Sequence, residues 1–395
     1  TGTVSNKNTT KSEAAFFNVP NATAYLYGGT FEDGYYYTIK NFGTMTINGA
    51  TVKRAAENDN VSSSQGSSLI ANGWYAATDA GYTHSETSGT PTLIIEDGTF
   101  DGGLNVVKND DYGVLTINGG TFQNSMGQVI MNWNRVTING GDFSAANSAQ
   151  ALLVNGSYNN GNNGADVGEL TVNGGTFTTN TATQTIFGTG QGSTKGGNLI
   201  ITDGAFNGKF TGSSSLPYEI EISGGSYTDD PSEHLSTEVE AVVSNSGKTR
   251  FGVYTDIQDA VDNANSGDTV TVYKPGLTVE MDENSGVQFE IANGATMPTI
   301  LPRSEEEEET YIPSTPISDG WHEYSLGTMY YQDGKRVRGW ADIEGATYYF
   351  DERGFMQTGW VELDTGWYYF AEDGKMATGW LQLGNTWYYL DPETG

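Results

Sequence analysis

The chain has 395 residues, enough for two or three domains, and it contains no cysteine, so neither a disulfide framework nor thiolate chemistry is expected. Its formal net charge is -31, with 18 Lys and Arg residues against 49 Asp and Glu residues, which argues against nucleic acid and anionic membranes as partners. No stretch approaches the roughly 20 consecutive apolar residues of a membrane span, and we expect no membrane insertion.

An eight-residue repeat runs through the first part of the chain. Residues 115–122 return almost unchanged as residues 136–143 and 170–177, and weaker copies end at Phe31, Val52, Phe100, Phe206 and Tyr227. Apolar and polar residues alternate in each copy, as in a strand, and Asn-Gly-Gly then turns the chain because glycine accepts a positive φ. A spacing of about 21 residues is too short for a βαβ unit and suits one coil of a parallel β-helix.

Stacked coils lie roughly 4.8 Å apart, so equivalent residues of successive coils should meet. We predict an internal stack of Phe100, Phe122, Phe143, Phe177 and Phe206. We also predict an amide ladder of Asn118, Asn139 and Asn173. The repeat resembles the right-handed parallel β-helix of pectate-lyase-like proteins, and we place this fold in residues 1–235. The alternative is a β-sandwich with coincidental repetition.

Two insertions interrupt the repeat. Residues 53–90 and 155–165 are rich in Asn, Ser and Gly, and we predict that they project from the β-helix as loops. In repeat proteins such insertions often contain the ligand-binding residues. The alternative is that they are solvated loops without a function.

Residues 236–301 predict a small α/β element. Apolar residues have helical spacing from residue 257 to 264, with Thr255 as the N-cap, and residues 269–273 alternate as a strand. We interpret this element as a cap on the exposed end of the β-helix, whose edges would otherwise be open to pairing. Residues 302–317 contain five consecutive glutamates and three prolines, which predicts an extended linker.

Four aromatic modules fill residues 318–395. Gly-Trp pairs recur at intervals of 19 or 20 residues, and aromatic runs such as Trp-Tyr-Tyr-Phe lie between them. Acidic turns that end in glycine follow these runs. A fixed period with glycine turns and paired aromatic strands predicts a solenoid of β-hairpins, because a single hairpin is marginally stable alone. The chain is therefore expected to be all-β apart from the capping element.

The motif G-W, W-Y-Y-[FL], D-G-K-M-x-T-G-W resembles the choline-binding and glucan-binding repeat families, together called cell-wall-binding repeats. The resemblance implies aromatic cages between consecutive hairpins, which hold a quaternary ammonium by cation–π attraction or stack on a sugar. It maps two walls of a cage onto Trp360 and Trp367, with Trp380 or Tyr389 as the third wall. The expected ligand-binding residues are Trp340, Trp360, Trp367, Tyr369, Trp380, Trp387 and Tyr389.

The first two modules depart from this motif. Met329 and Thr347 stand where the later modules have the first Trp of the Trp-Tyr-Tyr run, so these two cages are expected to be incomplete. The other rings are expected to pack the hairpins together: Tyr349, Phe350, Tyr368 and Phe370.

The β-helix offers few candidates for catalysis. A polysaccharide lyase needs a basic proton acceptor and often Ca²⁺ on clustered acids, and the best such cluster is Lys108 with Asp110 and Asp111. A glycoside hydrolase needs paired carboxylates, and the alternative role of aspartate in a turn is to form the turn. The turn carboxylates are Asp97, Asp142 and Asp203. The three histidines show no metal-ligand spacing, so Ca²⁺ is the one cofactor considered and no metal site is predicted.

These observations favour a secreted, wall-associated surface protein of a Gram-positive bacterium. In this interpretation the β-helix is an adhesion or display body with a host molecule or polysaccharide as its ligand. The aromatic repeats anchor it non-covalently to choline-bearing teichoic acid or another wall glycan. The alternative is a wall-anchored polysaccharide lyase or glycoside hydrolase with its active site on the β-helix. A third interpretation is a toxin-like glycan-binding protein.

Overall fold

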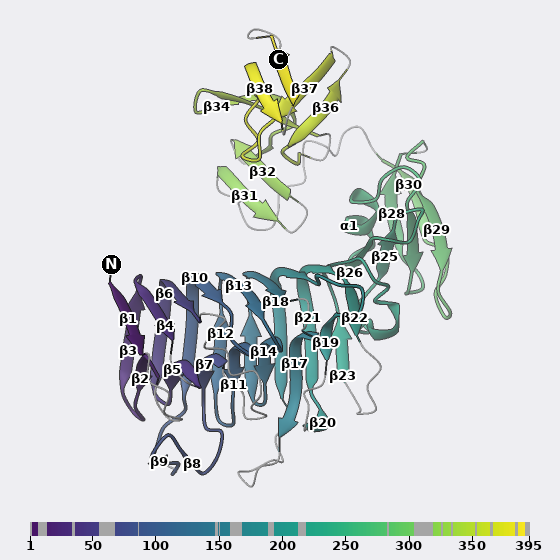
Figure 1. Cartoon of the computed structure of the whole chain (residues 1–395). Coiled ribbons are helices and arrows are strands. Elements are labelled where there is room, and N and C mark those ends of the chain that lie inside the picture. Colours follow the sequence, from purple (N-terminus) through teal and green to yellow (C-terminus); the bar gives the residue numbers. More distant parts are fainter. Residues whose placement is uncertain are drawn as a thin grey trace. The chain divides into compact units, whose positions relative to one another are not determined.

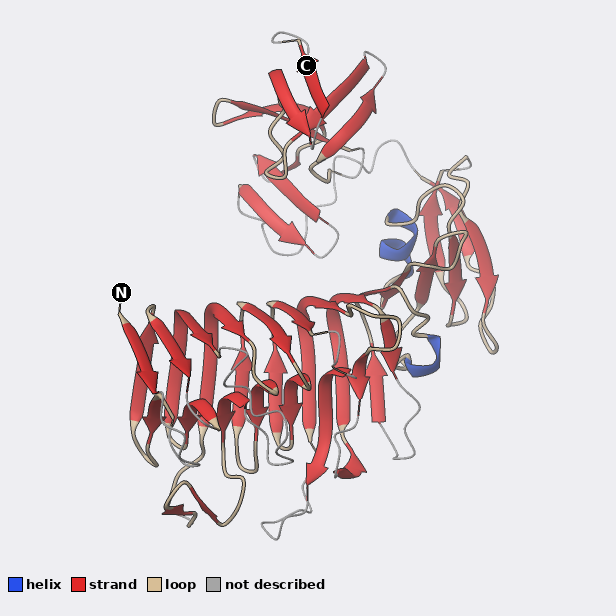
Figure 2. Ribbon diagram, in the orientation of Figure 1, coloured by secondary structure: helices blue, strands red, loops and turns tan. Residues whose placement is uncertain are grey.

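The computed structural model forms two compact units, Thr1–Leu301 and Pro302–Gly395 (Figure 1). It is built almost entirely from strands, with one α-helix among the described residues (Figure 2). The described residues are 2–6, 14–33, 36–54, 68–85, 87–146, 149, 151–158, 168–188, 193–211, 219–282, 284–303, 319–324, 327–332, 335–351, 354–363, 366–383 and 386–391.

The first unit is a parallel β-helix whose coils have three faces. In one coil these are β11 (Asn105–Asn109), β12 (Val114–Ile117) and β13 (Thr121–Ser125). Each pairs in parallel with its equivalent one coil later, namely β14 (Gln128–Asn132), β15 (Arg135–Ile138) and β16 (Asp142–Ala145). Parallel pairing between successive coils confirms the predicted β-helix and excludes the β-sandwich.

The remaining strands extend the same three faces. The face of β12 and β15 also contains β3 (Thr23–Tyr27), β23 (Glu219–Ile222) and the first halves of β6 (Thr44–Lys53), β10 (Thr92–Asp101), β18 (Glu169–Thr178) and β21 (Asn198–Asn207). The face of β13 and β16 contains the second halves of these four strands with β1 (Thr3–Asn6), β4 (Thr30–Asp33) and β24 (Ser226–Tyr227). The face of β11 and β14 contains β2 (Phe16–Asn18), β5 (Tyr37–Asn41), β7 (Ser68–Asn72), β17 (Ala151–Tyr158), β19 (Thr185–Gly188) and β22 (Lys209–Thr211).

All eight copies of the repeat lie in register. Their last residues pair in one line from coil to coil: Phe31, Val52, Phe100, Phe122, Phe143, Phe177, Phe206 and Tyr227. From Phe100 to Phe206 the ring centroids are 4.6 to 5.0 Å apart and the planes differ by 11° at most, which confirms the predicted stack. Tyr227 continues it at 4.8 Å from Phe206.

Two asparagine ladders run along the β-helix. The predicted, exposed ladder is confirmed, because Asn139 donates to the Asn118 side chain at 2.8 Å and Asn173 donates to Asn139 at 2.9 Å. A second, buried ladder was not predicted. It is formed by one asparagine from each of six successive coils, whose side chains are joined by hydrogen bonds of 2.7 to 3.0 Å: Asn18, Asn41, Asn72, Asn109, Asn132 and Asn155.

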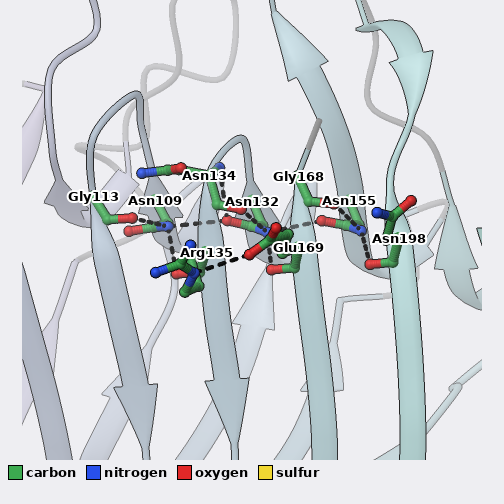
Figure 3. Close-up of polar contacts among 9 residues, drawn as sticks. All are labelled: Asn109, Gly113, Asn132, Asn134, Arg135, Asn155, Gly168, Glu169 and Asn198. Atoms are coloured by element: carbon green, nitrogen blue, oxygen red, sulfur yellow. Dashed lines mark hydrogen bonds and ion pairs between the residues drawn. The ribbon is translucent and has the colours of Figure 1, made fainter. Parts of the chain in front are cut away.

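The buried ladder satisfies the backbone where one face turns into the next (Figure 3). The Asn132 amide nitrogen donates to Asn155 and also to the carbonyl of Glu169 at 2.9 Å. Because these groups are removed from water, each bond replaces hydration that the turn has lost.

Two short antiparallel pairs lie outside the three faces. β8 (Thr78–Asp79) pairs with β9 (Tyr82–Thr83) within the first predicted insertion, and β20 (Ser193–Gly196), which follows β19, pairs with the end of β17. The loop prediction was wrong for residues 68–72, which form the buried strand β7 of the β-helix, and for residues 155–158, which end β17. Both predicted loops also lie partly outside the described residues.

The α/β element continues the sheet and belongs to the same compact unit as the β-helix. Its strands are β25 (Ala241–Ser244), β26 (Phe251–Tyr254), β27 (Thr269–Val272), β28 (Thr278–Met281), β29 (Gln288–Ile291) and β30 (Thr299–Pro302). β26 pairs antiparallel with β24, so it covers the edge of the last coil on that face. A 3₁₀ turn, η2 (Ser232–His234), precedes the element.

The helix of this element, α1 (Ile257–Asp262), is capped by Asp256, whereas the sequence analysis predicted Thr255. The Asp256 carboxylate accepts from the backbone N–H of Gln258 at 2.7 Å and of Asp259 at 3.4 Å. The prediction was wrong by one residue because the first helical residue is Ile257, and the cap is the residue directly before it.

The second unit consists of four antiparallel hairpins. They are β31–β32 (Gly320–Tyr324, Gly327–Gln332), β34–β35 (Gly339–Ile343, Ala346–Phe350), β36–β37 (Gly359–Leu363, Gly366–Phe370) and β38–β39 (Gly379–Leu383, Thr386–Leu390), with β33 (Lys335–Arg336) beside β32. The proposed linker, residues 302–317, lies outside the described residues except for its first two.

Backbone bonds from the connecting segments tie successive hairpins together. The amide of Met376, between the third and fourth hairpins, donates to the carbonyl of Thr347 in the second hairpin at 2.8 Å, and the amide of Ala377 donates to the carbonyl of Tyr369 in the third at 2.8 Å. Gly374, with a φ of 78°, packs so closely on Met356 of the previous connection that a Cβ atom would collide with it. The glycine at the end of each acidic turn is therefore required by both conformation and space.

Candidate functional site

The antiparallel register places the predicted ligand-binding rings on one face of each hairpin. In β36–β37, Trp360 lies opposite Tyr369, and Trp367 is two residues from Tyr369 on the same strand. Side chains alternate along a strand, so these three rings share a face, and Tyr368 and Phe370 point to the other. Phe370 is fully buried, which fits the packing role expected from the sequence, and Tyr368 is nearly buried.

In the first three hairpins the Gly-Trp indole packs against two tyrosines, one from its own hairpin and one from the next. Trp360 lies 5.2 Å from Tyr369 and 5.0 Å from Tyr388, with edge-to-face angles of 69° and 64°. We call such an indole with its two tyrosines a ring set. The same arrangement occurs twice more among the described residues, around Trp340 with Tyr349 and Tyr368, and around Trp321 with Tyr330 and Tyr348.

The indole of the fourth hairpin contacts rings of its own hairpin. Trp380 lies 5.2 Å from Tyr389 and 6.4 Å from Trp387. It is the most exposed tryptophan among those described, at 70%.

The predicted ligand-binding rings are unusually exposed for aromatic side chains. Apart from Tyr369, which is half-buried, their exposed fractions run from 37% to 70%: Trp340, Trp360, Trp367, Trp380, Trp387 and Tyr389. Indoles buried in a core would stabilise the fold, and exposed indoles forgo that stabilisation. A row of exposed indoles on a regular scaffold is therefore typical of a ligand surface.

The tyrosine that the following hairpin contributes was not predicted. Trp380 or Tyr389 was expected as the third wall at Trp360, and the structure places Tyr388 there. Tyr349 and Tyr368 were expected only to pack the hairpins together, whereas both contact the Trp340 indole. The signal that could have identified Tyr388 was its alternation with Tyr389 along β39, which turns Tyr388 toward the preceding hairpin.

The predicted catalytic cluster is buried in the β-helix. Lys108 is 2% exposed and Asp110 is not exposed, and the Lys108 Nζ lies 2.8 Å from the Asp110 carboxylate. The same Nζ lies over the rings of Trp133 and Tyr75, at 4.1 and 4.4 Å. Burial lowers the pKa of Lys108, while Asp110 opposes that shift. A polymeric substrate does not reach an amine enclosed in this way.

The surroundings of this cluster give it a structural role. Lys40 lies 2.7 Å from Asp79 of the β8–β9 insertion and 3.8 Å from Asp110. It also donates to the carbonyl of Gly73 at 2.9 Å. Asp111 accepts the backbone N–H of Trp74 at 3.0 Å through its carbonyl. These contacts hold the start of the insertion against the β-helix.

The turn carboxylates also have local partners. Asp97 and Asp203 each accept the backbone N–H of the next glycine, at 2.8 and 2.7 Å, which is the turn-forming role considered as the alternative. Asp142 is the exposed first residue of β16, directly after the equivalent turn of another coil. Within the described ranges no group of three or more His, Asp or Glu residues could hold a metal ion. No helix in the same ranges is long and apolar enough to cross a membrane.

Comparison with known proteins bears on the hairpin unit. A family model described as choline-binding repeat matches residues 337–366 and 358–395. Choline binding protein F from Streptococcus pneumoniae is 39% identical over 19% of this chain and 26% of its own, with a TM-score of 0.18. CbpJ from the same organism is 33% identical over 19% of this chain and 27% of its own, with a TM-score of 0.19. This chain thus spans about a quarter of the length of these two structures.

A third structure, a choline binding domain from Streptococcus pneumoniae, is 36% identical over 14% of this chain and 88% of its own, with a TM-score of 0.14. No match was found among curated proteins. Residues 337–395 thus consist of choline-binding repeats, and the chain belongs to the proteins that carry them.

Proposed function

We propose that the hairpin unit anchors this protein non-covalently to the cell wall of a Gram-positive bacterium by binding wall choline. The observation that carries the proposal is the ring set, which recurs in successive hairpins within and beside the matched repeats. A quaternary ammonium has no N–H group to donate, so it is bound by the faces of aromatic rings. Each good cation–π contact contributes about 0.5 to 2 kcal/mol of binding free energy. The net charge of -31 favours such a cation further.

Several weak sites in series account for anchoring. Once one ring set has bound, the next choline on the same polymer is presented at a high effective concentration, so the combined affinity exceeds that of any one site. The spacing of about 20 residues per hairpin keeps successive sites on one rigid stack.

We propose that the first unit is a secreted adhesion or display body with a host molecule or polysaccharide as its ligand. Its asparagine ladders and stacked phenylalanines make a stiff support for inserted loops. The buried position of Lys108 and Asp110 favours this role over that of a polysaccharide lyase. The turn bonds of Asp97 and Asp203 favour it over that of a glycoside hydrolase.

Binding of the full chain to purified walls tests the anchoring. The chain should sediment with choline-bearing walls, remain in solution with walls stripped of choline, and be released by free choline. Trp360→Ala should weaken retention, and Tyr25→Ala, which removes an exposed ring of the β-helix, should leave it unchanged. Retention that free choline does not reverse would remove choline as the ligand.

A further inference from the structure

Lys40 is a buried amine in the β-helix with two carboxylates beside it. It lies on β5, and its Nζ is 2.7 Å from the carboxylate of Asp79 on β8. The carboxylate of Asp110 lies 3.8 Å from the same nitrogen. The Asp79 side chain is 11% exposed, and the side chains of Lys40 and Asp110 are not exposed. An amine and two carboxylates are thus held together where little water reaches them.

Aromatic rings form another part of the surroundings of Lys40. Its Nζ lies 4.6 Å from the centroid of the Phe42 ring and 5.0 Å from that of the Tyr37 ring. Phe42 in turn stacks on the buried Trp74, with 4.1 Å between the ring centroids. Such rings attract the ammonium group but replace only part of the hydration that the amine and the carboxylates have lost. A reaction that removes a charge of each sign is therefore more favourable here than in water.

The distance between the amine and the carboxyl carbon of Asp79 permits such a reaction. A carboxyl C–O bond is about 1.2 Å long, so the Cγ atom of Asp79 lies at most about 3.9 Å from Nζ of Lys40. Reacting atoms approach from about 3 to 3.5 Å, which a small movement of the side chains reaches. Because the packed surroundings hold both groups in place, the entropy cost of bringing them together has been met by folding.

We propose that Lys40 and Asp79 condense to an intramolecular isopeptide bond, with Asp110 as the proton carrier. One proton of the Lys40 ammonium passes to the Asp79 carboxylate, which leaves a neutral amine beside a neutral acid. The lone pair of Nζ then forms a bond to Cγ. Asp110 takes a second proton from Nζ and delivers it to the hydroxyl group on Cγ. The C–O bond breaks, one water molecule leaves, and no group is oxidised or reduced.

The product suits the charges of this cluster. Before the reaction two lysines face two aspartates, and the second pair is Lys108 with Asp110 at 2.8 Å. The amide removes one charge of each sign, so the remaining pair stays balanced. Asp79 is the most exposed of the four side chains, which gives the released water an exit. The bond joins β5 to β8, so the β8–β9 insertion cannot detach from the β-helix unless a covalent bond breaks.

Intact mass spectrometry of the full chain tests the proposal. The measured mass should be lower than that of the sequence by one water molecule, and this deficit should persist when the chain is unfolded. A proteolytic digest should contain a branched peptide that joins the segments of Lys40 and Asp79, and trypsin should not cleave after Lys40. A folded chain with the full mass of its sequence, or a branch between other residues, would overturn the proposal.

Two variants separate the roles of the carboxylates, with circular dichroism as the check of folding. Asp110→Asn keeps both reacting groups but removes the proton carrier, and it should have the full mass of its sequence. Asp79→Asn should still form the amide, with loss of ammonia instead of water. Lys375 and Asp373 are an internal control, because they lie 2.6 Å apart but are exposed and should remain unlinked. A bond that forms in Asp110→Asn as fast as in the wild type would contradict the role of Asp110.

Discussion

Trp360 and Tyr388 belong to successive hairpins, and their ring centroids lie 5.0 Å apart at an angle of 64°. Tyr369 completes this ring set from the same hairpin as Trp360, at 5.2 Å. A ligand site of this kind is therefore a property of two neighbouring hairpins and cannot be assigned to one repeat alone.

Removal of the ring from the following hairpin tests this arrangement. Tyr388→Leu should weaken choline binding at Trp360 by about 2- to 30-fold, because one cation–π contact is lost while an apolar side chain still fills the space. Titration calorimetry of the full chain measures the effect. Tyr389→Leu is the matched control, since Tyr389 contacts Trp380 and should leave the Trp360 site intact. Equal losses in both variants would argue against Tyr388 as a wall.

The phenylalanine stack should dominate the stability of the β-helix. Phe143 is 1% exposed and lies 4.8 Å from Phe122 and 4.7 Å from Phe177. Phe143→Ala should lower the free energy of unfolding by about 3 to 5 kcal/mol, because it removes buried surface and leaves a cavity between two rings. Urea unfolding of the full chain, followed by circular dichroism, measures this loss. Phe143→Leu should cost clearly less, and an equal cost would point to the ring geometry rather than the volume.

The two asparagine ladders should differ in their contribution to stability. Asn132→Ala removes the buried acceptor of the Asn109 amide nitrogen and the donor to the buried Asn155 amide oxygen, at a cost of about 1 to 3 kcal/mol. Asn139→Ala interrupts the exposed ladder, where water replaces the lost bonds, and should cost less than about 0.5 kcal/mol. Thermal unfolding of both variants compares them directly. Similar losses would show that burial is not what makes the inner ladder stabilising.

Histidine burial predicts a loss of stability in mild acid. Burial lowers the pKa of His84 below its ordinary value of 6.5, and its ring stacks on Tyr112 at 4.1 Å. Below pH 6.5 the unfolded chain thus binds more protons at this site than the folded chain, and the free energy of unfolding falls as the pH decreases. The loss continues until the pH passes the lowered pKa.

His84→Phe should therefore reduce the drop in the urea midpoint between pH 7.5 and pH 5. The pKa of His234 is also lowered by burial, so His234→Phe serves as a second measure of the same effect. A midpoint difference between the two pH values that is the same in wild type and in both variants would assign the pH dependence to carboxylates instead.

The periodic parts of the fold could be predicted from the sequence because each coil repeats the same pattern of strand, turn and core residue. The copies that end at Phe122, Phe143 and Phe177 share alternation, turn and core residue, and the structure pairs all eight copies in line. Asn118, Asn139 and Asn173 form the predicted ladder for the same reason.

The parts that were missed depend on contacts between segments of irregular spacing. The buried ladder escaped notice because insertions of unequal length separate its members, and an asparagine before a turn is common. Lys108 and Asp110 are residue types that a lyase active site needs. Their burial became apparent only from the structure, in which the β8–β9 insertion and the neighbouring coils surround them. Tyr388 was missed because the cage was mapped by resemblance rather than by the alternation along its strand.

Val52 and Phe100 are partners in adjacent coils, although β7 and the whole β8–β9 hairpin lie between them in the chain. The register of the core residues thus does not depend on the length of the segment that connects them outside the core. A designer can exchange such an excursion for a peptide of another length and origin without retuning the interior. The same freedom lets natural variation diversify what this rod presents while its internal architecture stays constant.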